Sequence, residues 1–96
     1  METFLGAIKG VSYGNFPKTS VGKRSWIIAN YIQGSGYTGR TLGDIRDYLK
    51  RQSKNPITKE KLYASTRMLF KMGYAIKDKK NWIDTIIYEN KKFNKI

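Results

Sequence analysis

The chain is 96 residues long, carries a formal net charge of +12 at pH 7, and contains neither cysteine nor histidine. The length suits a single domain, and the two missing residue types exclude disulfides, thiolate metal ligands and the usual neutral-pH acid–base group. We therefore expect no catalytic residues, no metal site and no cofactor. The start of the chain lacks a secretory signal and no segment is long and apolar enough to span a membrane, so a cytoplasmic protein without a membrane partner is expected.

The positive charge is concentrated in one part of the chain. Between residues 50 and 80, ten lysines and arginines accompany only two acids, Glu60 and Asp78. An excess of this size predicts a polyanionic partner, with nucleic acid ahead of an anionic membrane surface. The alternative is the solvated surface of a lysine-rich protein, although scattered solubility charge usually mixes both signs.

The first half of the chain predicts an arm and two helices. Residues 1–19 show no helical period and are expected to form an irregular arm or a short strand. A helix is predicted over 20–33, because apolar side chains recur there on one stripe. The next helix begins at "TLGD", where Thr41 and Asp44 have the spacing of a capping box, and it should end near residue 51.

A third helix and a hairpin follow. Pro56 prevents a continuous helix, Thr58 is placed to cap the third one, and Gly73 to end it. The buried face is predicted to carry Leu62, Leu69 and Met72, flanked by Tyr63 and Phe70. After Gly73 the stretches "YAIK" and "WIDTIIY" are rich in aromatic and β-branched residues, which favour strands, and "DKKN" between them is a turn. Trp82, directly after this turn, is expected in the core, as is Trp26.

Over residues 20–88 the chain resembles the winged helix-turn-helix superfamily. The resemblance rests on "SWIIANYI", "TLGDIRDYL" and "ITKEKLYASTRMLFKMGYAIK". It implies a mainly α fold of three helices plus a C-terminal β-hairpin wing, with 1–19 as an N-terminal arm and 89–96 as a basic tail. It also implies a sequence-specific double-stranded DNA-binding protein, a small transcriptional regulator, whose third helix enters the major groove while the lysine-rich wing reaches the backbone. The abundance of lysine, asparagine, isoleucine and tyrosine suggests a viral or plasmid origin.

The resemblance assigns candidate DNA contacts. Base contacts are expected from Lys59, Lys61, Tyr63, Ala64 and Arg67. Arg67 is the best candidate because a guanidinium can bond guanine O6 and N7 together; otherwise it is a surface or phosphate-binding arginine. Backbone contacts are expected from Arg40, Thr41, Lys54, Asn55, Lys71, Lys77, Lys79, Lys80 and Asn81. Lys18, Lys23 and Arg24 are further cations that could reach DNA from the arm.

Two other functions stay open at this point. One is binding of RNA or single strands, in which aromatic side chains stack on bases; the candidates are Tyr13, Phe16, Tyr37 and Tyr63. The other is a protein-interaction or assembly module, with a homodimer as one form of it. Its candidate docking residues are Ile86, Ile87, Tyr88, Phe93 and Ile96.

Overall fold

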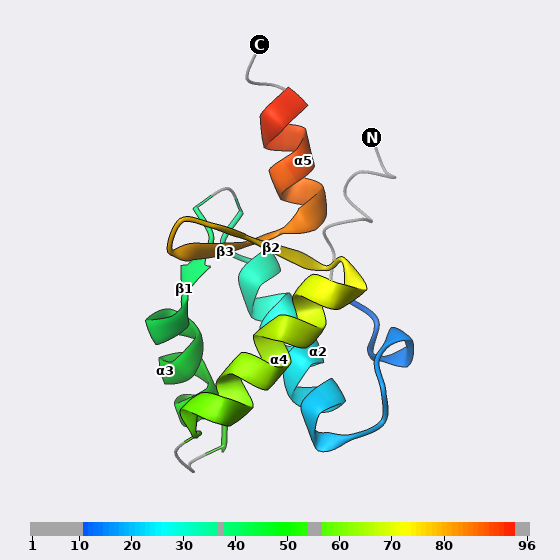
Figure 1. Cartoon of the computed structure of the whole chain (residues 1–96), viewed down its shortest axis with the longest axis vertical. Coiled ribbons are helices and arrows are strands. Elements are labelled where there is room, and N and C mark those ends of the chain that lie inside the picture. The colour runs from blue at the N-terminus through cyan, green and yellow to red at the C-terminus, as the bar shows by residue number, and fades with distance from the viewer. Residues whose placement is uncertain (1–10, 37, 54–56, 94–96) are drawn as a thin grey trace.

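The computed structural model describes residues 11–36, 38–53 and 57–93, without the side chains of 53 and 90–93. This part of the chain is mainly helical, with a small three-stranded antiparallel sheet (Figure 1). In chain order the elements are η1 (Tyr13–Asn15, a 3-10 turn), α2 (Ser20–Gln33), β1 (Arg40–Thr41), α3 (Leu42–Ser53), α4 (Lys59–Met72), β2 (Ala75–Asp78), β3 (Asn81–Asp84) and α5 (Thr85–Phe93). No helix of the described residues is long and apolar enough to cross a membrane.

The three predicted helices are confirmed, and polar caps fix where each begins. Thr41 Oγ1 accepts from the N–H of Asp44 (3.1 Å), and Asp44 Oδ2 accepts from the N–H of Thr41 (3.2 Å), which is a capping box at the start of α3. Thr58 Oγ1 accepts from the N–H of Lys61 at the start of α4. Gly73 ends α4 in the left-handed conformation, with φ +81°.

The sheet contains the predicted hairpin and one strand that was not predicted. β2 and β3 pair through Asp78 and Asn81, so the hairpin turn has only two residues, Lys79 and Lys80. β1 pairs with the other edge of β3, which gives the strand order β1-β3-β2. β1 therefore connects the segment before α3 to the hairpin.

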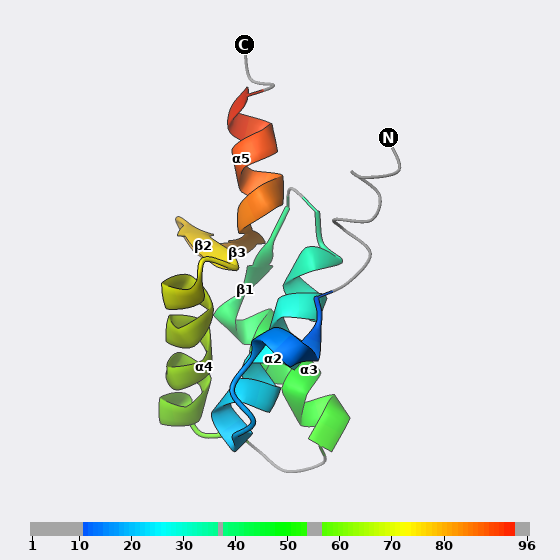
Figure 2. The same cartoon turned by 90° about the vertical axis from the view of Figure 1, so that its right-hand side faces the viewer.

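The prediction that the second strand continues through residues 85–88 is wrong, because these residues form the first turns of α5. Asp84 is the cause: its Oδ1 accepts from the N–H groups of Ile86 (2.9 Å) and Ile87 (3.2 Å). These bonds are those of a helix N-cap, and they outweigh the β preference of two isoleucines and a tyrosine. The helix continues past residue 88 to Phe93 and projects from the body of the molecule (Figures 1 and 2).

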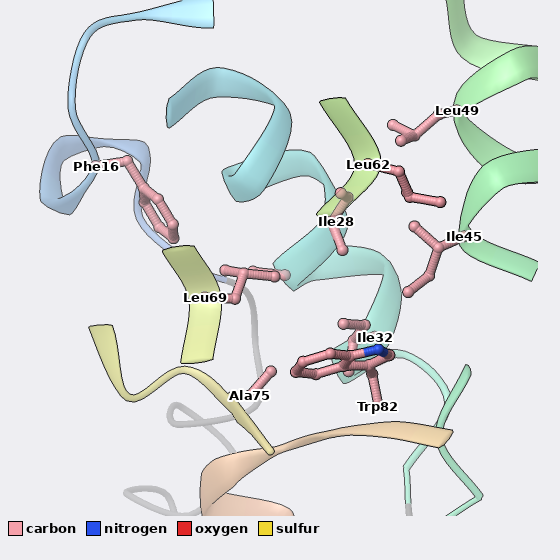
Figure 3. Packing of buried hydrophobic residues seen from close by; sticks show 10 residues of the cluster. Phe16, Ile28, Ile32, Ile45, Leu49, Leu62, Leu69, Ala75 and Trp82 are labelled. Carbon is pink, nitrogen blue, oxygen red and sulfur yellow. The ribbon is translucent and has the colours of Figure 1, made fainter. Parts of the chain in front are cut away.

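The core lies where α2, α3 and α4 meet the sheet (Figure 3). Ile28, Ile45 and Leu69, one from each helix, are fully buried. Trp82 reaches this cluster from β3, so its predicted core position is confirmed. The arm also contributes, because Phe16 is 3% exposed and packs in the same cluster.

Candidate nucleic-acid interface

The outward face of α4 carries all of the candidate base-contacting side chains. One side of the helix is buried in the core through Leu62, Ser65, Thr66 and Leu69. By the 100° step of a helix the opposite side must face solvent. The exposed residues of α4 are Lys59, Glu60, Lys61, Tyr63, Ala64, Arg67, Phe70 and Lys71.

Hydrogen bonds hold α4 against α2. Ser25 Oγ, on the buried side of α2, donates to the carbonyl of Val21 (2.7 Å) and lies 3.3 Å from that of Ser65. Arg24 Nη1 donates to Ser65 Oγ (3.0 Å) and to the carbonyl of Lys61 (3.4 Å). Burial lowers the pKa of Arg24 from its ordinary value, but a guanidinium stays charged at neutral pH. Arg24 therefore fixes the first half of α4 in place.

The hairpin turn presents further positive charge. Lys77, Lys79 and Lys80 are exposed, whereas Asn81 is half-buried. Lys79 has φ +60°, a left-handed conformation that favours glycine. The tight turn thus holds a lysine where a glycine would fit with less strain.

Together, α4 and the hairpin form a strongly cationic pair of elements. From residue 59 to residue 80 they carry seven lysines and arginines against Glu60 and Asp78. The hairpin joins α4 through Gly73 and Tyr74 and then diverges from it (Figure 1). The last turn of α3, with Lys50 and Arg51, lies away from the outer side of α4 (Figure 2). Lys50 and Arg51 therefore do not share a face with the cations of α4.

The candidate backbone contacts before α3 are engaged within the chain. The guanidinium of Arg40 lies 4.1 Å from the ring centroid of Tyr31, and its Nε donates to the Tyr31 carbonyl (3.4 Å). Thr41 caps α3, as described above. Arg40 and Thr41 thus stabilise the fold by contacts that need no ligand. Lys54 and Asn55 lie outside the described residues.

Two shallow apolar grooves flank Arg67, and the sequence did not predict them. The first, of about 250 Å³, lies between α4 and β3 and is lined by Tyr63, Thr66, Arg67, Phe70 and Trp82. The second, of about 300 Å³, is lined by Ala64, Arg67, Met68, Lys71 and Met72. Phe70, expected at the edge of the core, is 60% exposed. The sequence signal for the first groove was the spacing of Tyr63, Arg67 and Phe70. These residues follow one another at i, i+4 and i+7, which places them on one face of the helix.

The aromatic residues proposed for base stacking are only partly available. Phe16 is wrong in that role because it is buried, and it stacks on Tyr74 at 4.9 Å between ring centroids. Tyr13 is half-buried against Trp26, also at 4.9 Å. Tyr63 is 44% exposed. Tyr37 lies outside the described residues.

The residues proposed for docking a protein partner also differ in their exposure to solvent. Ile86 is 48% exposed, but Ile87 is buried at 8% exposure, so Ile87 is wrong as a docking residue. Successive residues of a helix lie about 100° apart, so in α5 Ile86 faces solvent while Ile87 faces inward. Tyr88 is half-buried. The side chain of Phe93 and the whole of Ile96 lie outside the described residues.

Within the described residues, no three acidic side chains lie close enough to hold a metal ion. α4 and the hairpin offer exposed cations, which suit binding to an anionic surface, together with two apolar grooves beside Arg67. No protein-family model, curated protein or solved structure matches the chain.

Proposed function

We propose that the chain is a sequence-specific double-stranded DNA-binding protein of the winged helix-turn-helix type, acting as a small transcriptional regulator. In this proposal α2, α3 and α4 are the three helices, α4 is the recognition helix and the β2–β3 hairpin is the wing. The order of elements supports the proposal, because a short connection joins α3 to α4 and the hairpin follows α4 directly. The observation that carries it is the outward face of α4, which exposes Arg67 together with Lys59, Lys61 and Lys71.

The first half of α4 reads bases in this proposal. Arg67 projects from the middle of the exposed face, so it can approach a guanine edge in the major groove without moving a core residue. Ala64 has no long side chain and allows close approach of the helix to the base pairs. Lys59 and Lys61 lie in the first turn, where recognition helices make many of their contacts.

The wing and the end of α4 position the protein on the duplex. Lys71, Lys77, Lys79 and Lys80 are exposed, and such cations bind phosphates without reading sequence. If five of the seven cations of α4 and the hairpin each neutralise a phosphate, log affinity falls with log salt at a slope of about −4.5. Contacts from all seven would bring the slope to about −6.

The test compares charge removal on α4, on the hairpin turn and on α3. A duplex is first selected from a random pool, and its affinity is measured by mobility shift over a range of salt. Arg67→Ala should relax the sequence preference, whereas the double variant of Lys79 and Lys80 to alanine should weaken all duplexes alike and lower the slope by about 1.8. Lys50→Ala removes one positive charge from the last turn of α3 and should change little.

Three outcomes would count against the proposal. A slope near zero would exclude a phosphate-binding surface. Equal effects of the Arg67 and lysine variants would refute the division into base-reading and backbone contacts. Tighter binding to a single strand or RNA of the same sequence would favour the single-strand alternative. Sedimentation of the free protein and of its complex with the selected duplex tests whether two copies bind together.

A further inference from the structure

Exposed aromatic side chains gather at one place on the described surface. Among the described residues, the large hydrophobic side chains that are well exposed are Tyr63, Phe70 and Ile86. Tyr63 and Phe70 are seven residues apart on α4, so they lie on one side of this helix two turns apart. Clustered apolar exposure of this kind marks a binding surface more often than scattered single residues do.

These two residues form the walls of the groove between α4 and the hairpin. Trp82 of β3 and Thr66 also line it, and Arg67 lies between Tyr63 and Phe70 along the helix. The two elements that form the groove also carry exposed lysines, among them Lys71 on α4 and Lys77 on the hairpin. The groove is thus an apolar surface that includes one cation, Arg67, and lies on two elements with a net positive charge.

The charge around the groove restricts what can occupy it. A second copy of the chain would bring its net charge of +12 to a chain of the same charge, which like-charge repulsion disfavours. An anionic partner with small apolar projections fits both features. In duplex DNA the apolar projection into the major groove is the 5-methyl group of thymine, and phenylalanine is among the side chains that contact it.

We propose that the groove lined by Tyr63, Phe70 and Trp82 reads thymine methyl groups, with Phe70 as the main specificity residue. The proposal rests on the DNA-binding function proposed above and adds the class of base that α4 selects. Arg67, between Tyr63 and Phe70 along the helix, contacts an adjacent guanine. The preferred site therefore combines a guanine with one or two neighbouring thymines.

The magnitude follows from apolar burial. Burying one methyl-sized group away from water raises the affinity of a complex by about fourfold. One methyl contacted by Phe70 should then contribute about fourfold, and a second, contacted by Tyr63, should bring the total to about 15-fold. The lysines cannot supply this preference, because phosphate contacts are the same for every sequence.

Replacing thymidine by deoxyuridine tests the proposal, because it removes the methyl group and leaves charge and base pairing unchanged. The selected duplex and its deoxyuridine counterpart are compared by fluorescence anisotropy at fixed salt. Wild-type protein should bind the deoxyuridine duplex about 4- to 15-fold more weakly. Phe70→Ala should reduce this difference by about fourfold while still binding duplex DNA. Ile86→Ala removes another exposed apolar side chain, from α5, and should keep the full difference.

The outcomes separate this inference from the proposed function. If wild-type protein binds both duplexes equally and with the expected salt dependence, the thymine inference is wrong and the DNA-binding proposal stands. If Phe70→Ala keeps the full difference, the methyl groups are read elsewhere and the assignment to this groove is wrong. If neither duplex binds at low salt, both proposals are wrong.

Discussion

Alanine in place of Gly22 should destabilise this protein, although the same change usually stabilises a helix. Gly22 is buried in the first turn of α2. A Cβ atom placed on it would lie 1.9 Å from the carbonyl oxygen of Pro17 and 2.8 Å from its carbonyl carbon. Non-bonded carbon atoms pack at about 3.5–4.0 Å, so the backbone of the arm must move. Phe16 adjoins Pro17 and is buried in the core, so its packing is disturbed with it.

Two opposing effects set the size of the loss. Helix propensity favours alanine over glycine by about 1 kcal/mol. Forcing extra volume into a packed site costs about 1–3 kcal/mol, and displacing a buried phenylalanine forfeits part of the roughly 1.5–3 kcal/mol that its burial contributes. We expect the free energy of unfolding to fall by about 2 kcal/mol, which for a domain of this size lowers Tm by about 8–16 °C.

Gly43 provides the matched control, because it occupies the first turn of α3 and is exposed. The nearest atom to a Cβ there is Thr41 Oγ1, at 3.7 Å, so alanine has room. Gly43→Ala should raise the free energy of unfolding by about 0.5–1 kcal/mol. Urea unfolding followed by far-UV circular dichroism measures both variants. If Gly22→Ala gained stability as Gly43→Ala does, the arm would not lie against α2 as described.

Three further changes test the core, the α2–α4 contact and the hairpin turn. Leu69→Ala, at a fully buried site, should lower the free energy of unfolding by about 2–5 kcal/mol, and a loss below 1 kcal/mol in urea unfolding would contradict the packing. A double-mutant cycle between Arg24→Ala and Ser65→Ala should give a coupling of about 1 kcal/mol, because the two side chains share a hydrogen bond; additive effects would refute that contact. Lys79→Gly relieves a φ of +60° and should raise stability by about 0.5–1 kcal/mol in thermal unfolding. The same change should lower the salt slope of DNA binding by about 0.9, and a stability loss would show that the turn has another conformation.

The helices were predictable because local chemistry fixes their ends. The capping box of Thr41 and Asp44, the Thr58 cap and Gly73 all act within a few residues of the chain. Such signals need no knowledge of the tertiary fold. The predicted bounds of α2 agree with the structure for the same reason, since Thr19 caps it and Gly34 follows it.

The parts that were missed depend on contacts between distant residues. β1 has only two residues, Arg40 and Thr41, and exists because β3, about forty residues later, pairs with it. Nothing in so short a segment indicates a strand. α5 was misread because isoleucine and tyrosine favour strands, but Thr85 donates its N–H to the Tyr74 carbonyl (3.0 Å) and the Asp84 cap then starts a helix. Aspartate directly before the segment was the available signal.

The prediction of the candidate site failed at positions of α4 that break the usual amphipathic pattern, in which apolar residues are buried and polar residues are exposed. Ser65 and Thr66 are buried, while Phe70 is 60% exposed. The buried hydroxyls are satisfied, since Ser65 accepts from Arg24 and Thr66 bonds within the preceding turn. Small polar side chains let α2 approach closely, but an exposed phenylalanine adds nothing to that contact. An aromatic ring held out in water beside Arg67 contributes little to folding, so the outward face of α4 is the part of this chain whose composition a binding partner explains best.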